Sequence, residues 1–335
     1  VMREEAERIF RDNTDNYGRK LFLIENCIYG VDIQPIAVQI AKMRFFISLI
    51  VDQKINPAAP NRGIRALPNL ETKFVAANTL IGIEKKEVQG DLLTEDAAAH
   101  QKLRELRKRL TEVRHRHFTA RTTASKAKCR EQDRALRADM STLLGGAGLS
   151  AAWSRQLAAW DPYDQNASSP FFDPEWMFGV RDGFDVVIGN PPYGRILAEK
   201  VQTQLSHNCP AFGATKDAYV AFMVNGLGLL RDCGCESYIV PSAWLGGPAY
   251  HLLREEMLRQ TFWQVIALPF DIFSAAYVDN VVYVITKEAP KQDHRARVFS
   301  YAKNSAFGEF RPSPWQEIVQ SAWESMPDRK LVLSE

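Results

Sequence analysis

Apolar runs of strand length alternate with helical segments after Arg181, and this rhythm limits the fold more than any other feature of the sequence. Strands that alternate with helices favour a mostly parallel sheet with helices on both faces. We therefore predict an α/β chain with a doubly wound, mostly parallel sheet. The expected strands are Phe184–Ile188, Ser237–Val240, Trp263–Leu268 and Asn280–Thr286, and the expected helices are Thr215–Arg231 and Pro248–Gln260.

The first part of the chain has the same character. We expect a strand over Leu21–Ile33, a helix that starts at Pro35 and a short strand over Lys73–Ala77. Proline suits the first turn of a helix because its missing N–H would have no partner there. Residues 1–83 and 181–290 are therefore expected to form two parts of one core. Residues 291–335 contain no clear element and are expected to connect to a further region.

Residues 84–180 interrupt this core with a different composition. Between His100 and Asp139 there are 13 Lys/Arg and 5 Asp/Glu, a net charge of +8, which leaves −6 for the rest of a chain whose total is +2. An a/d heptad pattern runs through Leu103, Leu106, Leu110 and Val113 and continues weakly through His117, Ala120, Ala124 and Ala127, until Gly145-Gly146 stops it. This pattern predicts a coiled-coil-like helical hairpin that is either a solvated arm or a contact to the DNA backbone.

Composition excludes several classes of protein. Hydrophobic residues make up 46% of the chain, which is enough for a sizeable core. The longest apolar stretches, such as Phe45–Val51, are far shorter than the roughly 18 residues of a membrane span, so we expect no membrane partner and a cytoplasmic location. The five cysteines are scattered and lack the spacing of a zinc site, so we expect no metal.

The tetrapeptide Asn190-Pro191-Pro192-Tyr193 directly follows an apolar strand and carries the most specific chemistry in the chain. A planar amine is a poor nucleophile because its lone pair is delocalised. Two acceptors, the Asn190 side-chain oxygen and the Pro191 carbonyl, could bind the two amine hydrogens and direct the lone pair at an electrophile. The prolines stiffen the backbone, and the ring of Tyr193 offers a stacking surface for a base.

A second strand end carries an acidic residue, Asp32. Ligands of open α/β sheets bind beyond the carboxyl ends of the strands. A carboxylate there can accept hydrogen bonds from both ribose hydroxyls of a nucleoside-type cofactor, although an aspartate at a strand end is more often a helix cap. No G-x-G-x-x-G precedes this strand, which argues against a nicotinamide-dependent oxidoreductase.

These segments resemble known enzymes. VVIGNPPYGR looks like the catalytic motif of amino-methylating, S-adenosyl-L-methionine-dependent methyltransferases, and the segment from Ile28 to Asp52 resembles that of their large adenine-specific DNA members. The nearest likeness is to type IIG restriction–modification enzymes and BREX-type phage-defence methylases. The resemblance implies methylation of adenine N6 in double-stranded DNA within the prokaryotic cytoplasm, in association with the nucleoid.

The resemblance also implies roles for individual residues. Asn190, Pro191, Pro192 and Tyr193 correspond to the catalytic motif, and Asp32 corresponds to the acidic ribose binder. The other implied cofactor-binding residues are Ile33, Asn78, Thr79 and Asn190, with Asn78 beside the cofactor's adenine. Asp217 and Tyr219 match the helix that packs beside the site, while Ser237–Trp244 and Val278–Ile285 match later strand motifs.

The sequence departs from the family pattern at two places. The glycine-rich first motif, an acidic residue followed by G-x-G, is absent upstream of Tyr29. Its strand would lie between the strand that ends at Asp32 and the strand that ends before Asn190, so we expect the first strand of the fold to be lacking and two inner edges to be unpaired. The target-recognition region is missing too. We therefore expect an internal piece of a longer polypeptide whose flanking regions complete the fold.

Several alternatives stay open at this point. The same tetrapeptide serves enzymes that methylate cytosine N4, RNA bases or protein glutamine amides. The basic helical segment favours a long nucleic acid over a compact protein substrate. A non-catalytic, DNA-binding fragment is a further alternative, since the first cofactor motif is lacking.

Overall fold

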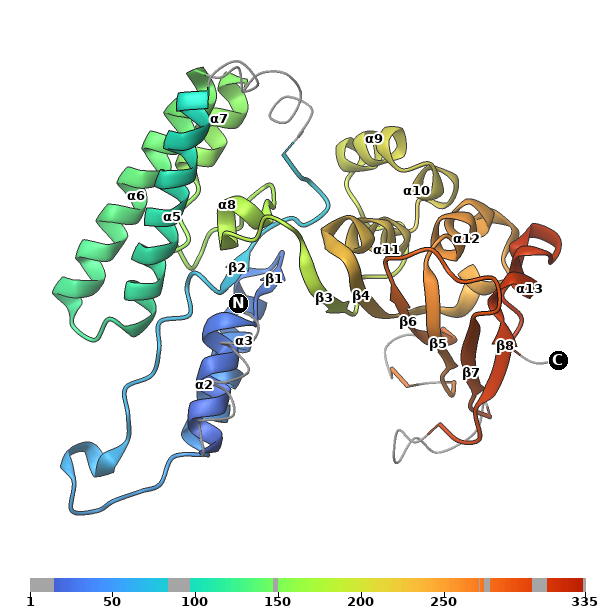
Figure 1. Ribbon diagram of the computed structural model, residues 1–335, viewed down its shortest axis with the longest axis horizontal. Helices are drawn as coiled ribbons and strands as arrows, with labels where there is room; N and C mark the ends of the chain where they lie inside the picture. Colours follow the sequence, from blue (N-terminus) through green and yellow to red (C-terminus); the bar gives the residue numbers. More distant parts are fainter. Residues whose placement is uncertain are drawn as a thin grey trace. The chain divides into compact units, whose positions relative to one another are not determined.

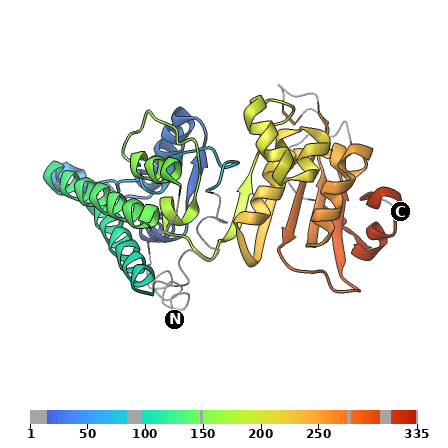
Figure 2. The same ribbon diagram turned by 90° about the horizontal axis from the view of Figure 1, so that it is seen from above.

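The computed structural model of the protein describes residues 15–83, 97–146, 150–270, 272–273, 278–302 and 312–333. The chain divides into two compact units, residues 1–179 (unit 1) and residues 180–335 (unit 2), and each unit has its own sheet (Figures 1 and 2). Among the described helices, none has both the length and the apolar composition to cross a bilayer.

Unit 1 contains a two-stranded parallel sheet, one helix that packs on it and a second helix that packs on the first. Its elements here are α2 (Asn16–Asn26), β1 (Gly30–Asp32), α3 (Pro35–Ile50), the 3-10 helix η1 (Pro60–Gly63) and β2 (Phe74–Ala76). The predicted helix start is confirmed, because Pro35 occupies the first turn of α3. Asp32 is in register with Ala76, so the carboxyl ends of β1 and β2 lie at the same edge.

The predicted strand over Leu21–Ile33 is wrong for most of its length, because α2 takes the residues up to Asn26. The Asp15 carboxylate accepts a hydrogen bond from the Gly18 N–H at 2.6 Å and caps this helix. Tyr17 and Ile24, two turns apart, point into the core. The apolar run therefore follows a helical period, and only three residues form β1.

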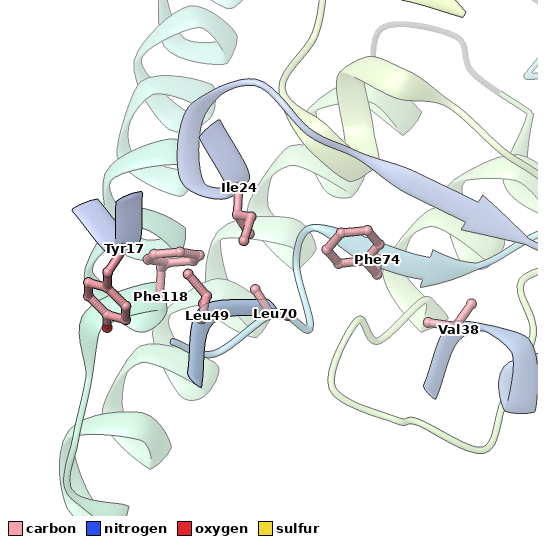
Figure 3. Packing of buried hydrophobic residues seen from close by; sticks show 7 residues of the cluster. All are labelled: Tyr17, Ile24, Val38, Leu49, Leu70, Phe74 and Phe118. Atoms are coloured by element: carbon pink, nitrogen blue, oxygen red, sulfur yellow. The ribbon is translucent and has the colours of Figure 1, made fainter. Parts of the chain in front are cut away.

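The core of unit 1 joins helices and strand from distant parts of the chain. Phe118 lies beside Tyr17 and Leu49 in Figure 3, where the side chains of the cluster converge. Its buried members are Tyr17, Ile24, Val38, Leu49, Leu70, Phe74 and Phe118. Since Phe118 belongs to the segment expected as an insertion, that segment contributes to the core of unit 1 as well as projecting from it.

The predicted helical hairpin is present. Its helices are α5 (Ala97–Thr119) and α6 (Thr123–Gly146), followed by α7 (Ala151–Ala159) and α8 (Pro174–Phe178), and α5 and α6 run side by side in both views (Figures 1 and 2). The four heptad leucine and valine positions of α5 are buried at 3–5% exposure, as predicted. The expected continuation through Ala120, Ala124 and Ala127 is wrong, because the chain reverses at residues 120–122 and exposes Ala124 and Ala127.

A buried ion cluster fixes this hairpin to the rest of unit 1. The fully buried Asp133 accepts hydrogen bonds from Arg114 at 2.8 Å and from Arg137 at 2.6 Å, and these cations hold the pKa of its carboxyl below the usual range despite burial. Both guanidinium groups also donate to backbone carbonyls, Arg114 to those of Trp176 and Met177 and Arg137 to that of Trp160. Part of the basic charge of the hairpin is therefore internal.

Unit 2 is built on a six-stranded sheet in the order β3-β4-β6-β5-β7-β8. The strands are β3 (Phe184–Gly189), β4 (Leu230–Pro241), β5 (Thr261–Ala267), β6 (Asn280–Thr286), β7 (Arg295–Ser300) and β8 (Gln316–Val319). The β3–β4 and β5–β7 pairs are parallel, and the other three pairs are antiparallel. The prediction of a mostly parallel sheet is therefore corrected to a mixed sheet.

The described helices of unit 2 cover one face of this sheet (Figures 1 and 2). They are α9 (Glu199–Asn208), α10 (Pro210–Thr215), α11 (Ala218–Leu229), α12 (His251–Leu258) and α13 (Gln320–Glu324), with 3-10 helices η2 (Ser242–Leu245), η3 (Pro248–Tyr250) and η4 (Pro327–Arg329). Along β6, Val281 and Tyr283 are buried, whereas Val282 and Val284 are half-buried. This alternation is typical of a sheet with one packed face, so helices on both faces are not found among the described residues.

The last 45 residues are more ordered than the sequence indicates. The expectation that they contain no clear element is wrong, because β7, β8 and α13 extend the sheet and its cover. Trp323 of α13 is 1% exposed and packs edge-on against Phe262 at 5.7 Å. Its indole N–H donates to the Val332 carbonyl at 2.9 Å, so this segment is part of the core of unit 2.

Candidate active site

The Asn-Pro-Pro-Tyr segment forms a corner at the carboxyl end of β3. Asn190 and Pro192 are exposed, Pro191 is buried and Tyr193 is half-buried. β3 ends at Gly189, opposite Tyr238 of β4. The strand fixes the first residue of the corner, and the two prolines limit the backbone that follows, so the Asn190 carboxamide is presented at the surface of the sheet edge.

Tyr193 and Asn190 contact each other within this corner. The Tyr193 hydroxyl lies 3.2 Å from Oδ1 of Asn190 and 3.4 Å from the Ile239 carbonyl oxygen. One O–H donates to one acceptor at a time, so the hydroxyl either occupies the Asn190 oxygen or leaves it open to another donor. Burial raises the pKa of Tyr193, which keeps the phenol protonated and able to donate.

Asp217 holds the residue that follows the corner. Its Oδ1 accepts a hydrogen bond from the Gly194 N–H at 2.7 Å, and its Oδ2 accepts one from the Tyr250 hydroxyl at 3.1 Å. The Ala218 N–H donates to the Gly194 carbonyl at 3.0 Å. Gly194 has a φ of +86°, which favours glycine. The exit of the corner is therefore bonded to the start of α11 on both sides.

Three tyrosine rings line the inner side of the corner. The rings of Tyr193 and Tyr219 meet edge to face with centroids 6.4 Å apart, and Tyr219 stacks on Tyr250 at 6.0 Å. Tyr219 is fully buried. The Tyr193 ring thus rests against a fixed neighbour, and the residue is only partly buried, so part of it can contact a planar ligand.

Four of the five predicted cofactor residues lie in unit 1, whereas Asn190 belongs to the corner in unit 2. Asp32 is exposed at the end of β1, and one of its carboxylate oxygens accepts a hydrogen bond from the Gln34 N–H at 2.8 Å. Asn78 follows β2, and its side-chain oxygen accepts one from the Leu80 N–H at 3.2 Å. The Ala77 N–H donates to the Asp32 carbonyl at 2.9 Å, so the structure brings Asp32 and Asn78 to the same edge of the sheet.

The other two predicted cofactor residues flank this edge. Ile33 is 57% exposed just after Asp32, and Thr79 is half-buried just after Asn78. A cleft against α3 and β2 is lined by Gln39, Lys42 and Trp160 among others but not by Asp32 or Asn78. Within the described residues, no group of three or more His, Cys, Asp or Glu side chains could hold a metal.

Large apolar side chains are exposed beside both predicted site segments. On α3 they recur at a spacing of four and three residues and are 41–64% exposed: Ile36, Ile40, Met43, Ile47 and Ile50 (the α3 face). On β3, Val186 is 59% and Ile188 is 76% exposed. Among the described strands, β1 pairs only with β2 and β3 pairs only with β4. Each unit therefore has an unpaired strand edge.

Sequence reasoning missed two residues near the corner. Tyr250 carries no local signal because its partner Asp217 is 33 residues away. Glu236 lies in β4, is fully buried, and accepts a hydrogen bond from the Tyr283 hydroxyl, while its Oε2 has no partner among the described residues. Burial raises its pKa to about 8. Its position in an apolar strand was the only available signal.

The curated proteins that the chain resembles include restriction–modification enzymes. The chain is 28% identical over 346 residues to RM.MjaORFECS2P of Methanocaldococcus jannaschii, which is named as a type II restriction enzyme and methyltransferase; the match covers 89% of this chain and 29% of that protein. The type II methyltransferase M.TthHB8I of Thermus thermophilus is 27% identical over 127 residues, 32% of this chain and 29% of its own. The chain therefore spans about 29% of the length of the curated relatives it matches.

Among solved structures, the type IIL restriction–modification enzyme MmeI in complex with DNA matches 94% of this chain and 37% of its own, with 12% identity and a TM-score of 0.39. The type IIG endonuclease BpuSI matches 59% and 24%, with 16% identity and a TM-score of 0.34. A family model described as Eco57I restriction-modification methylase matches residues 26–273, which is most of the chain. The chain belongs to the Eco57I restriction-modification methylase family.

Proposed function

We propose that the complete protein transfers a methyl group from S-adenosyl-L-methionine to N6 of adenine in double-stranded DNA. The observation that carries this proposal is the Asn190 carboxamide, exposed at a proline-stiffened strand end beside the half-buried ring of Tyr193. Membership of the Eco57I methylase family supports DNA as the substrate.

In this proposal the corner orients the reacting amine. The target adenine leaves the base stack, since its amine cannot be reached within the duplex. Oδ1 of Asn190 and the Pro191 carbonyl accept the two hydrogens of the amine, and the Tyr193 ring stacks on the base. The Tyr193 hydroxyl then gives up Asn190 Oδ1 and donates to the Ile239 carbonyl. Most of the rate comes from orientation of the amine rather than from a strong base.

The edge formed by Asp32 and Asn78 fits a nucleoside-type cofactor in part. Within the described residues one Asp32 oxygen accepts a backbone N–H, that of Gln34, so the other oxygen can accept hydrogen bonds from ribose hydroxyls. Asn78, Thr79 and Ile33 flank it at the same edge. When bound, S-adenosyl-L-methionine supplies an electrophilic methyl group. A glycine-rich loop that would hold the rest of the cofactor does not precede Tyr29.

We also propose that a further segment of the same polypeptide completes the fold and supplies this loop. Among the described strands, β1 and β3 each have an edge without a partner, which supports this, because an open edge in a core sheet leaves ladder groups unbonded. The α3 face supports it as well, since contiguous exposed apolar surface marks a surface that is normally covered.

Transfer of tritiated methyl groups by the complete protein tests the function. Duplex DNA, RNA and protein are offered in parallel, and the modified base is identified by mass spectrometry after digestion. We expect uptake by duplex DNA and recovery of N6-methyladenine.

Recovery of N4-methylcytosine instead would show that the enzyme methylates cytosine N4 rather than adenine N6. Uptake by RNA or by a protein glutamine would reject DNA as the substrate. An absence of transfer, together with salt-sensitive DNA binding, would favour the non-catalytic DNA-binding alternative.

A further inference from the structure

The N-cap residue of α11 does not cap its own helix. Asp217 is the N-cap of α11, and an aspartate at this position ordinarily accepts a hydrogen bond from a backbone N–H of its own first turn. Here the carboxylate makes no such bond. Both of its oxygens are instead used outside the helix, by the Gly194 N–H at 2.7 Å and by the Tyr250 hydroxyl at 3.1 Å. The helix forgoes a cap worth about 1 kcal/mol, and the corner gains an anchor.

The corner has few other ways to be held by its backbone. Pro191 and Pro192 have no N–H, so the chain offers no donor at these two positions. The Gly194 N–H comes shortly afterwards and donates to Asp217. Gly194 also closes the loop from its other side, because its carbonyl accepts the Ala218 N–H. A shift of Asp217 would therefore release the end of the corner, while β3 would still hold its start.

The same contacts decide where the Tyr193 ring lies. Tyr193 precedes Gly194 directly, and its ring rests against Tyr219, which stacks on Tyr250. Tyr250 in turn donates to Asp217. Asp217 thus supports Tyr193 through the backbone at Gly194 and through the ring stack behind it.

We infer that Asp217 is a positioning residue that sets the Asn190–Tyr193 corner for methyl transfer, with Tyr250 holding its carboxylate. This inference rests on the proposed function for its catalytic consequence. Its structural part is that the Asp217 carboxylate fixes Gly194 instead of capping α11. This part depends on the observed hydrogen bonds alone.

The test compares Asp217→Ala, Asp217→Asn and Tyr250→Phe in the complete protein. Asparagine keeps an oxygen for the Gly194 N–H and a polar group for Tyr250, so it is the conservative variant. Ser150→Ala is the control, since it removes the side-chain cap of a helix in unit 1, α7. Single-turnover methyl transfer, cofactor affinity and hydrogen exchange at the Gly194 amide are measured for each.

We expect Asp217→Ala to slow single-turnover transfer by roughly 10–100-fold, with cofactor affinity changed less than about twofold, because orientation rather than binding is lost. Asp217→Asn should restore the rate to within about threefold of the unmodified protein, and Tyr250→Phe should fall between the two. Exchange at Gly194 should accelerate at least about tenfold in Asp217→Ala only, since that amide loses its acceptor. Ser150→Ala should change none of these.

The inference would be overturned by unchanged exchange at Gly194 in Asp217→Ala, or by full transfer activity once that protection is lost. Equal losses in Asp217→Asn and Asp217→Ala would also overturn it, because the anchor would then not depend on an acceptor at this position. If the unmodified protein transfers no methyl group to DNA, the proposed function fails, whereas the exchange experiment still decides whether Asp217 fixes the corner.

Discussion

The predicted catalytic corner and the predicted cofactor edge are held in different ways. At the corner, Gly194 is bonded to Asp217, 23 residues later in the chain, and Tyr250 supports Asp217 from a further 33 residues away. At the cofactor edge, Asp32 and Asn78 each bind a backbone N–H only two residues ahead. The corner depends on the packing of unit 2, whereas the side chains of Asp32 and Asn78 are held by local turns and the pairing of β1 with β2 joins their backbones.

This difference predicts how far the effect of a substitution spreads. Changes in the packing of unit 2 should move the corner, because its anchors belong to separate elements. Changes at the cofactor edge should remain local, since a two-residue turn needs no distant partner. The predictions below test this contrast, beginning with the largest expected effect.

Asp133→Ala should destabilise unit 1 by about 3–5 kcal/mol, because it leaves the buried Arg114 without its carboxylate and leaves Arg137 with the longer contact to Asp161 at 3.7 Å. Urea denaturation measures the loss. The exposed pair between Arg259 and Glu256 is the control, and Glu256→Ala should cost no more than about 1 kcal/mol. If the cofactor edge is truly local, folded Asp133→Ala protein keeps its cofactor affinity; a large drop in that affinity would break the contrast.

Asn190→Ala should lower methyl transfer by about 10²–10³-fold, because it removes an acceptor that orients the reacting amine. Cofactor affinity should be almost unchanged, since Asn190 acts on the substrate side in this mechanism. Asn208→Ala, at the exposed end of α9, is the matched control. Equal turnover in the two variants would reject the assignment of Asn190.

Glu236 should make the stability of unit 2 fall as pH rises. Burial raises its folded-state pKa to about 8 from an ordinary value of 4.5, so the folded state holds a proton that the unfolded state releases between these values. Stability should therefore fall as pH rises through that window. Glu236→Gln keeps the acceptor for the Tyr283 hydroxyl and should flatten the dependence. Thermal melts from pH 5 to 8 measure it, and parallel curves for the two proteins would contradict the prediction.

Asp32→Asn should weaken cofactor binding by about tenfold, since a hydrogen bond to a charged acceptor is worth about 1.5–3 kcal/mol and the amide replaces it in part. The local turn to Gln34 should survive, because asparagine keeps an acceptor oxygen. Asp164→Asn is a close control: Asp164 is also exposed in unit 1 and binds an N–H two residues ahead. Calorimetry with S-adenosyl-L-methionine on the complete protein distinguishes the two, and equal affinities would remove Asp32 from the cofactor site.

Local signals predicted the elements that surround the site. Pro35 marks the start of α3, Gly145-Gly146 marks the end of α6, and the predicted strand Asn280–Thr286 agrees with β6 at both ends. Each of these signals acts within a few residues, through a missing donor, a flexible backbone or an apolar run bounded by turns.

The remaining features depend on contacts between distant residues. The apolar run that starts at Leu21 fits a strand and a helix equally well. The hydrogen bond from the Gly18 N–H to the Asp15 carboxylate caps the helix and favours it. β8 is short and partly exposed, so it has no clear pattern of its own and exists through its pairing with β7. The anchor at Asp217 was visible only as a family likeness, because its partners Gly194 and Tyr250 are set by the fold.

The exposed α3 face affects the stability and solubility of unit 1 in the cell. The α3 face presents five large apolar side chains in one row. A second copy of the protein could bind there as readily as the segment that normally covers it. The stability of unit 1 is then shared with whatever covers α3, and by mass action it rises with the affinity of that contact. The solubility of the polypeptide therefore reports whether the α3 face is covered.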